Sequence, residues 1–289
     1  MNLNQILGGC LQGGQKLSRG LKAAALLTVV SASQLVSATP VVTEELQKAV
    51  DNPERTAAFK ARDSYRHPAE TLAFFDVQSD MTVVEIWPGG GWYTEILGPY
   101  LNRQGKFYAA HFPANSQVAF FTRMRKSFEE KLSANPKHYN RVEISSFHPP
   151  SNAVSAPAGE VDRVLTFRNV HNWMKAGYGE QAFTEFFKVL KPGGVLGVVE
   201  HRAKPGTAEA AMIRSGYVTE AYVIEQAQKA GFVLEAKSEV NANPNDSTIH
   251  PKGVWTLPPS LRLGDEDKEK YLAIGESDRM TLKFRKPLK

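Results

Sequence analysis

The chain has 289 residues, of which 42% are hydrophobic and 22% charged, a composition typical of one large globular domain with appendages. Its formal net charge is +5, but no long basic stripe and no interleaving of basic with aromatic residues accompanies that charge, so a nucleic-acid partner is not predicted. Because Cys10 is the only cysteine, the composition also excludes a disulfide framework and a cysteine-held metal site.

Residues 1–38 have the pattern of a signal peptide. They contain no Asp or Glu, and basic residues such as Lys16 and Lys22 precede an apolar run over 23–30. A run of about eight apolar residues is too short to cross a bilayer, which takes roughly 20. We therefore expect cleavage near Ala38, a periplasmic or secreted mature protein over 39–289, and no stable membrane insertion afterwards.

Two other interpretations of this segment remain open. A mitochondrial transit peptide is also poor in acidic residues and contains Lys and Arg. A lipoprotein signal ending at Cys10 is the weaker alternative, because only nine residues precede it and none of them is basic.

The mature region predicts strands that alternate with helices. Residues 39–76 form a helical lead-in, and a Pro-, Asn- and Gly-rich stretch over 241–279 forms a long inserted loop. The apolar runs between them predict strands over 82–87, 106–112, 141–147, 164–168, 195–200, 232–237 and 280–285. Helical spacing predicts helices near 96–101, 118–132, 183–190 and 217–230, with the turn 191–194 ending the third. This alternation predicts an α/β domain with a doubly wound, parallel sheet.

The strongest site signal is the segment Val-Val-Glu-Ile-Trp-Pro-Gly-Gly-Gly-Trp over 83–92, a buried strand that leads into a glycine loop. Glycines let the backbone approach a ligand closely, and ligands of open parallel sheets bind at the carboxyl ends of the strands. An acid at the strand end, Glu85, suits a ligand with a positive amino group. A dinucleotide fingerprint would need a third glycine after Gly91, which is absent, so a nicotinamide-dependent oxidoreductase is the weakest of the functional hypotheses.

Together with the turn Lys-Pro-Gly-Gly-Val-Leu over 191–196 and Ala-Gly-Phe over 230–232, this loop resembles the class I S-adenosylmethionine-dependent methyltransferase superfamily over roughly residues 65–285. Segments 88–97, 167–173 and 275–282 are similar to a bacterial family of predicted, often exported, methyltransferases. The resemblance implies a mostly parallel seven-stranded sheet with an antiparallel last strand, S-adenosylmethionine as cofactor and a small-molecule methyl acceptor.

The resemblance also implies roles for individual residues. Glu85 would hold the amino group of the cofactor, His111 would contact its ribose, and the loop would make room for the rest, through Gly89, Gly90, Gly91 and Tyr93. Two positions depart from the superfamily pattern. Trp87 occupies the place of the first glycine, and His111 stands where an acid usually holds the ribose hydroxyls, although a neutral imidazole accepts only one hydrogen bond.

Several polar residues follow the ends of predicted parallel strands and are expected to share one crevice. His171 or His201 would serve as base or orienter for methyl transfer, with Asn169 and Arg202 positioning the acceptor. Together with Glu200 the histidines also have the chemistry of a zinc or iron site, but no local ligand spacing supports it, so no metal is predicted.

Two classes of function fit these residues. The first is methyl transfer to a small molecule. The second is an exported, non-catalytic binding protein that retains the methyltransferase fold, which Trp87, His111 and the export signal favour because S-adenosylmethionine is made in the cytosol.

Overall fold

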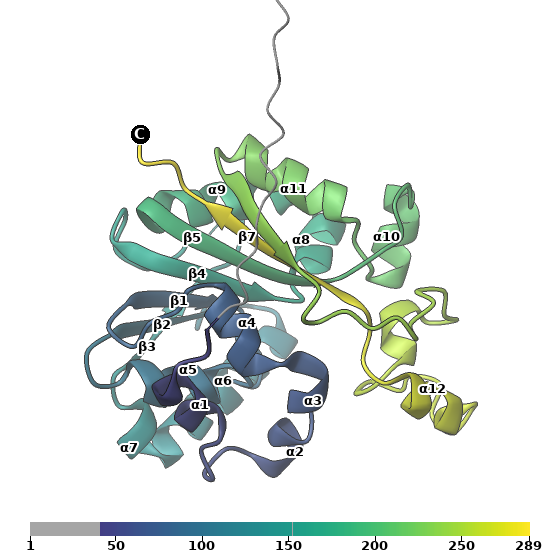
Figure 1. The fold of residues 1–289 in the computed structure, drawn as a ribbon, viewed down its shortest axis with the longest axis horizontal. Helices are drawn as coiled ribbons and strands as arrows, with labels where there is room; N and C mark the ends of the chain where they lie inside the picture. Colours follow the sequence, from purple (N-terminus) through teal and green to yellow (C-terminus); the bar gives the residue numbers. More distant parts are fainter. Residues whose placement is uncertain (1–40, 152) are drawn as a thin grey trace, which may run out of the picture. The chain divides into compact units, whose positions relative to one another are not determined.

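The computed structural model describes residues 41–151 and 153–289. The predicted signal peptide and its boundary at Ala38 lie outside the described residues. The centre of the domain is a seven-stranded sheet of order β3-β2-β1-β4-β5-β7-β6, and Figure 1 shows it with helices on both faces. The predicted α/β, doubly wound sheet is confirmed.

Six strands run in the same direction, and β7, which is antiparallel to both of its neighbours, lies between β5 and β6. Each predicted strand is present, with ends that differ from the prediction by a few residues. The strands are β1 (Thr82–Ile86), β2 (Lys106–His111), β3 (Val142–Ser146), β4 (Val161–Phe167), β5 (Leu190–His201), β6 (Val233–Ser238) and β7 (Arg279–Arg285).

Helices cover the two faces of this sheet in two groups, which lie below and above it in Figure 1. The first group contains α1 (Glu44–Val50), α2 (Ala57–Lys60), α3 (Asp63–Arg66), α4 (Pro68–Phe74), α5 (Thr94–Leu101), α6 (Ala119–Ala134) and α7 (Pro136–Tyr139). The second contains α8 (Val170–Ala176), α9 (Gly179–Val189), α10 (Glu209–Ser215) and α11 (Glu220–Lys229). No helix among the described residues is long and apolar enough to cross a membrane.

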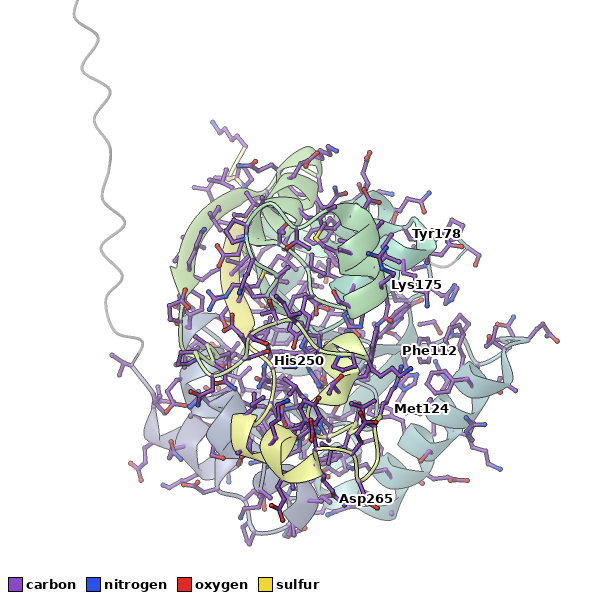
Figure 2. All side chains as sticks on the ribbon, turned by 90° about the vertical axis from the view of Figure 1, so that its right-hand side faces the viewer. Phe112, Met124, Lys175, Tyr178, His250 and Asp265 are labelled. Carbon is purple, nitrogen blue, oxygen red and sulfur yellow. The ribbon has the colours of Figure 1, made fainter. Side chains whose placement is uncertain are left out.

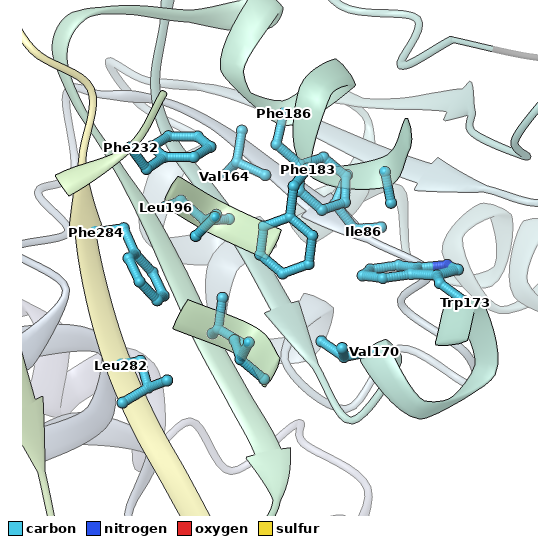
Figure 3. Packing of buried hydrophobic residues seen from close by; sticks show 14 of the residues in the cluster. Ile86, Val164, Val170, Trp173, Phe183, Phe186, Leu196, Phe232, Leu282 and Phe284 are labelled. Atoms are coloured by element: carbon cyan, nitrogen blue, oxygen red, sulfur yellow. The ribbon is translucent and has the colours of Figure 1, made fainter. Parts of the chain in front are cut away.

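The core has two layers because alternate strand residues point to opposite faces. Val83 of β1 packs with α1, α4 and α5, whereas its neighbour Val84 packs with α8, α9 and α11. The second layer is rich in aromatic side chains, and Figure 3 shows Phe183 and Phe186 of α9 packed near Trp173 of α8. Both faces of the central strands are therefore buried, as the continuous apolar runs of the sequence require.

The prediction of a turn over 191–194 that ends the helix before β5 is wrong. Helix α9 ends at Val189, and β5 begins directly at Leu190, so the residues Lys-Pro-Gly-Gly lie inside the strand. Gly193 has a φ of 76°, and its N–H donates to the carbonyl of Lys286 beyond β7 at 2.9 Å. The glycines therefore form an irregular first part of β5, which is paired with the C-terminal segment.

The stretch predicted as an inserted loop, 241–279, contains the 3₁₀ helix η1 (Gly253–Thr256) and α12 (Lys268–Ile274). Leu257 and Tyr271 are buried, so the stretch packs on the domain. The lead-in 39–76 is divided among four short helices, and the chain around Pro53 forms a turn between the first two.

Gly197 of β5 offers a test of how tightly the first layer is packed. A Cβ at this position would lie 2.7 Å from the Phe75 ring and 2.9 Å from Leu165. We expect Gly197→Ala to lower the free energy of unfolding by about 1–3 kcal/mol, because the core cannot take the extra methyl group without shifting. Urea denaturation measures the change, and Gly90→Ala is the control since its Cβ would meet only ordinary contact at 3.7 Å. Equal losses in both variants would contradict the tight packing.

Candidate functional site

A cavity of about 350 Å³ lies at the carboxyl ends of β1, β4 and β5. Its walls come from four parts of the chain: the lead-in around α2 and α3, the glycine loop after β1, the ends of β4 and β5, and the stretch 241–279. Figure 2 faces this edge of the sheet, and the stretch that carries His250 and Asp265 lies in front of the strands. The cavity is therefore at the crevice where the sequence predicts a ligand.

Glu85 lines this cavity and is 2% exposed. Its Oε2 accepts a hydrogen bond from Thr94 Oγ1 at 2.7 Å, at the start of α5. Burial raises the pKa of the Glu85 carboxyl to about 8, and the Thr94 hydroxyl offsets only part of that rise. At neutral pH the carboxyl is thus mostly protonated, and a cationic ligand group would draw it into the ionised form.

The glycine loop contributes unequally to the cavity. Gly89 and Gly90 line it, and Gly89 has a φ of 60° with open space where a Cβ would stand. Tyr93 also lines it and stacks on Phe167 with ring centroids 3.6 Å apart. Gly91 does not belong to the lining, because its Cα faces the Phe128 ring, which a Cβ would approach to 3.1 Å.

His111, predicted to contact the ribose, is not among the residues that line the cavity. Its Nδ1 accepts from the backbone N–H of Phe112 at 2.8 Å, which assigns the proton to Nε2, and Nε2 donates to the Gly89 carbonyl at 3.3 Å. Burial lowers the pKa of His111 to about 4, so the ring is neutral. Both nitrogens are engaged by the backbone, and Nε2 holds the glycine loop.

Trp87 fills the space beside His111. It adopts a left-handed backbone with a φ of 49°, a conformation that suits the glycine of the superfamily pattern and strains other residues. Its indole N–H donates to the Phe147 carbonyl at 2.8 Å, and its ring lies 4.9 Å from that of Phe112 and 5.5 Å from that of Trp173. Aromatic side chains therefore pack beyond the ends of β2 and β3. Trp87 lines the cavity, but no described residue of these two strands or of the segments that follow them does so.

His171 and Glu200 form a buried pair that faces the cavity. The Glu200 carboxylate is fully buried at the end of β5; its Oε1 lies 3.0 Å from His171 Nδ1, and its Oε2 accepts from the His171 backbone N–H at 3.2 Å. The His201 backbone N–H also donates to this carboxylate, at 2.8 Å. With its Nδ1–H directed at Glu200, His171 keeps Nε2 as a proton acceptor, which is the arrangement of a general base and its orienter.

His201 and Asn169 also line the cavity, as the sequence predicts for one shared crevice. His201 Nδ1 lies 2.6 Å from Ser277 Oγ, and burial, reinforced by nearby positive charge, lowers the pKa of His201 well below its usual value. Asn169 Nδ2 donates to the Ile86 carbonyl at 2.9 Å, so this side chain ties the loop after β4 to the end of β1.

Arg202 does not join the other predicted residues. It lies outside the cavity lining, in an ion-pair network with three carboxylates. The Arg202 guanidinium makes two hydrogen bonds of 2.9 Å to Asp278, and it also contacts Glu220 and Glu239. This pairing gives Arg202 a structural place between β5, β6 and the start of β7.

The cavity contains charged residues that sequence reasoning did not select as site residues. Arg62, Arg66 and Arg168 line it together with Glu276. The lead-in arginines are distant in sequence from every strand end, so no motif pointed to them. Only the packing of α3 against the stretch before β7 brings them to the crevice.

The histidine pair and Glu200 lie close enough to hold a metal ion, with one ligand atom from each within 4.8 Å of the others. Glu200 is already an acceptor for three N–H groups, and Arg66, Arg168 and Arg279 oppose positive charge on His201. These contacts disfavour a cation, and the absence of a resident metal stays a prediction.

Replacement of Glu85 by Gln tests whether the Glu85 carboxyl is protonated in the folded chain. Because the pKa of Glu85 is about 8 when folded and near 4.5 when exposed, the folded chain holds this proton more tightly. The protonated Glu85 carboxyl therefore favours the folded state fully below pH 4.5. This stabilisation is lost as the pH rises towards 8, at up to about 1.4 kcal/mol per pH unit. Relative to the parent, Glu85→Gln should gain stability over this window in denaturation curves from pH 5 to 9. Parallel curves, like those expected for the exposed Glu143→Gln, would refute the assignment.

No protein-family model and no curated protein matches the chain. Solved structures do resemble it. A S-adenosylmethionine-dependent methyltransferase from Aquifex aeolicus is 18% identical, with a TM-score of 0.52 over 83% of this chain and 96% of that one. The [4+2]-cyclase SpnF is 18% identical, with a TM-score of 0.53 over 84% and 92%.

An arsenic(III) methyltransferase from Chlamydomonas reinhardtii is 10% identical, with a TM-score of 0.51 over 84% and 73%. Identities this low establish the fold alone, and one of these neighbours is described as a cyclase. The chain has the fold of the class I S-adenosylmethionine-dependent methyltransferases.

Proposed function

We propose that this protein is a S-adenosylmethionine-dependent methyltransferase that acts on a small molecule. The observation that carries the proposal is the buried Glu85 carboxyl, which lies at the end of β1, without a cationic partner among the described residues, in the cavity next to Gly89 and Gly90. A carboxyl in this place suits the ammonium group of the cofactor, and the two glycines leave room in front of the loop.

The residues fit the amino-acid half of this cofactor better than its nucleoside half. Glu85, Gly89 and Gly90 would hold the amino-acid half, whereas the nucleoside half would need Trp87 to turn away from Phe147. When bound, the cofactor supplies an electrophilic methyl group. The chain's own contribution is to orient the acceptor and take its proton.

The proposed base is His171. Glu200 fixes its ring with Nδ1–H towards the carboxylate and leaves Nε2 to accept a proton from an acceptor hydroxyl or amine. The imidazolium formed in this way lies 3.0 Å from a negative charge, which stabilises it. His201, neutral because of its burial, would contribute a hydrogen bond rather than a charge.

A second candidate is favoured by Trp87 and His111. Because aromatic side chains pack beyond the end of β2 and both His111 nitrogens are engaged, a binding protein that retains the fold without methyl transfer also suits the chain. Such a protein would use the same cavity for another ligand. Calorimetry separates the two candidates.

Titration with S-adenosylhomocysteine should show micromolar binding, weakened at least tenfold by Glu85→Gln. Below pH 8 the binding should release up to one proton, because the ammonium group ionises Glu85. The heat measured in buffers of different ionisation enthalpy reports that proton, and methylthioadenosine, which lacks the amino group, is the control. If S-adenosylhomocysteine binds only after Trp87→Gly, or not at all, the binding-protein candidate replaces the methyltransferase.

Export also belongs to the proposal. This part of the proposal is supported by residues 1–38, which contain no Asp or Glu and have basic residues before an apolar run. Mass spectrometry of the protein from native cell fractions should find a chain that begins near Thr39 outside the cytoplasm. A full-length cytoplasmic product would contradict export and would place the protein beside its cofactor supply.

A further inference from the structure

One wall of the cavity has an excess of positive charge. Arg62 and Arg66 reach it from α3 and the residue before it, and Arg168 reaches it from the end of β4. Arg279, at the start of β7, lies close behind them and is 3% exposed. Four guanidinium groups from three separate parts of the chain therefore surround a single carboxylate, that of Glu276.

Glu276 cannot neutralise this group of arginines. Its Oε1 pairs with Arg62 Nε at 2.5 Å, and its Oε2 lies 3.2 Å from both Arg66 Nε and Arg279 Nη2. Of the other acids at the cavity, Glu200 is paired with His171, and Glu85 is mostly protonated at neutral pH. Even when Glu200 is counted, four positive charges face two negative ones.

The arginines also keep donors that nothing in the described part of the chain satisfies. Nη2 of Arg62 and Nη2 of Arg66 are buried without a hydrogen-bond partner. The Arg168 guanidinium makes no side-chain hydrogen bond to the described residues, and burial lowers its pKa to about 10. Buried donors are nearly always paired in folded proteins, so the two Nη2 groups point to a ligand that supplies acceptors. The half-buried Arg168 guanidinium is free to bind the same ligand.

We propose that Arg62, Arg66 and Arg168 form a subsite for a doubly charged phosphate group on the molecule that the protein methylates. A carboxylate offers one charge and two oxygens, which suit one bidentate arginine. A phosphate group has a charge of −1.5 to −2 and three acceptor oxygens, which match the excess of two charges and the three guanidinium groups. The role as acceptor subsite rests on the proposed methyl transfer, whereas the binding of the anion does not.

The subsite is tested by adding inorganic phosphate, with acetate and chloride at equal ionic strength. The variants are Arg168→Gln and Arg62→Gln, and the matched control is Arg103→Gln, an exposed arginine away from the cavity. Phosphate should raise the melting temperature of the parent and of the control by several degrees more than acetate does. Calorimetry should show at least tenfold weaker phosphate binding in both cavity variants.

Without phosphate, Arg168→Gln should melt at a temperature equal to or above that of the parent, because it removes the repulsion of Arg168 by Arg279 and Arg62. This readout separates loss of binding from loss of the fold. Equal effects of phosphate and acetate, or phosphate binding that Arg168→Gln leaves unchanged, would overturn the subsite.

A second titration, with the protein saturated by S-adenosylhomocysteine, assigns the subsite to one of the two substrates. Unchanged phosphate binding supports the acceptor, whereas competition would assign the arginines to the carboxylate of the adenosyl ligand and overturn the proposal. If S-adenosylhomocysteine does not bind but phosphate does, through the same arginines, the methyltransferase function fails and the anion subsite stands.

Discussion

The burial of an unpaired carboxyl at the end of β1 is the constraint on which the rest of the site depends. Among the described residues no cation lies beside Glu85, so it is mostly protonated at neutral pH and its surroundings are uncharged, while the arginines that line the same cavity keep an excess of positive charge. The two regions suit different ligand groups: a cationic group beside Glu85 and an anionic group beside the arginines. A cavity with this division suits two molecules, or one molecule with separated charges.

Trp87 decides how much of the crevice is available. In an open α/β sheet the ligand normally extends across the ends of the neighbouring strands at the switch point. Here the indole ring donates to the Phe147 carbonyl and packs on Phe112, so it occupies the space beyond the ends of β2 and β3. His111 holds the glycine loop through its contact with the Gly89 carbonyl. Glycine would adopt the left-handed backbone of this position without strain. The presence of Trp87 is therefore explained by the contacts of its side chain and not by the turn.

The fold could be predicted from the sequence because its signals are local. Each apolar run of strand length, and the helical spacing of Phe183 and Phe186, lies within one short segment of the sequence. The antiparallel last strand was predicted from the resemblance to the superfamily. The site was accessible only in part. Glu85 lies one residue before the end of β1, Gly89 and His171 follow strand ends, and topology brings the three together. The arginines of α3 reach the same cavity through packing between residues more than 200 positions apart, as in the pair of Arg66 with Glu276, which no local pattern contains.

The position of β7 in the sheet has a consequence for how the chain is made. Within the described part of the chain, β7 is the one strand to which β6 is hydrogen-bonded, and β7 also pairs with the edge of β5. While the ribosome is still synthesising the residues before Arg279, β6 has no partner, and neither Ser277 nor Glu276 has closed the cavity over His201 and Arg66. The edge of the sheet and the cavity are therefore completed only when the C-terminal strand is available, so a nascent chain stays incompletely folded until its synthesis ends.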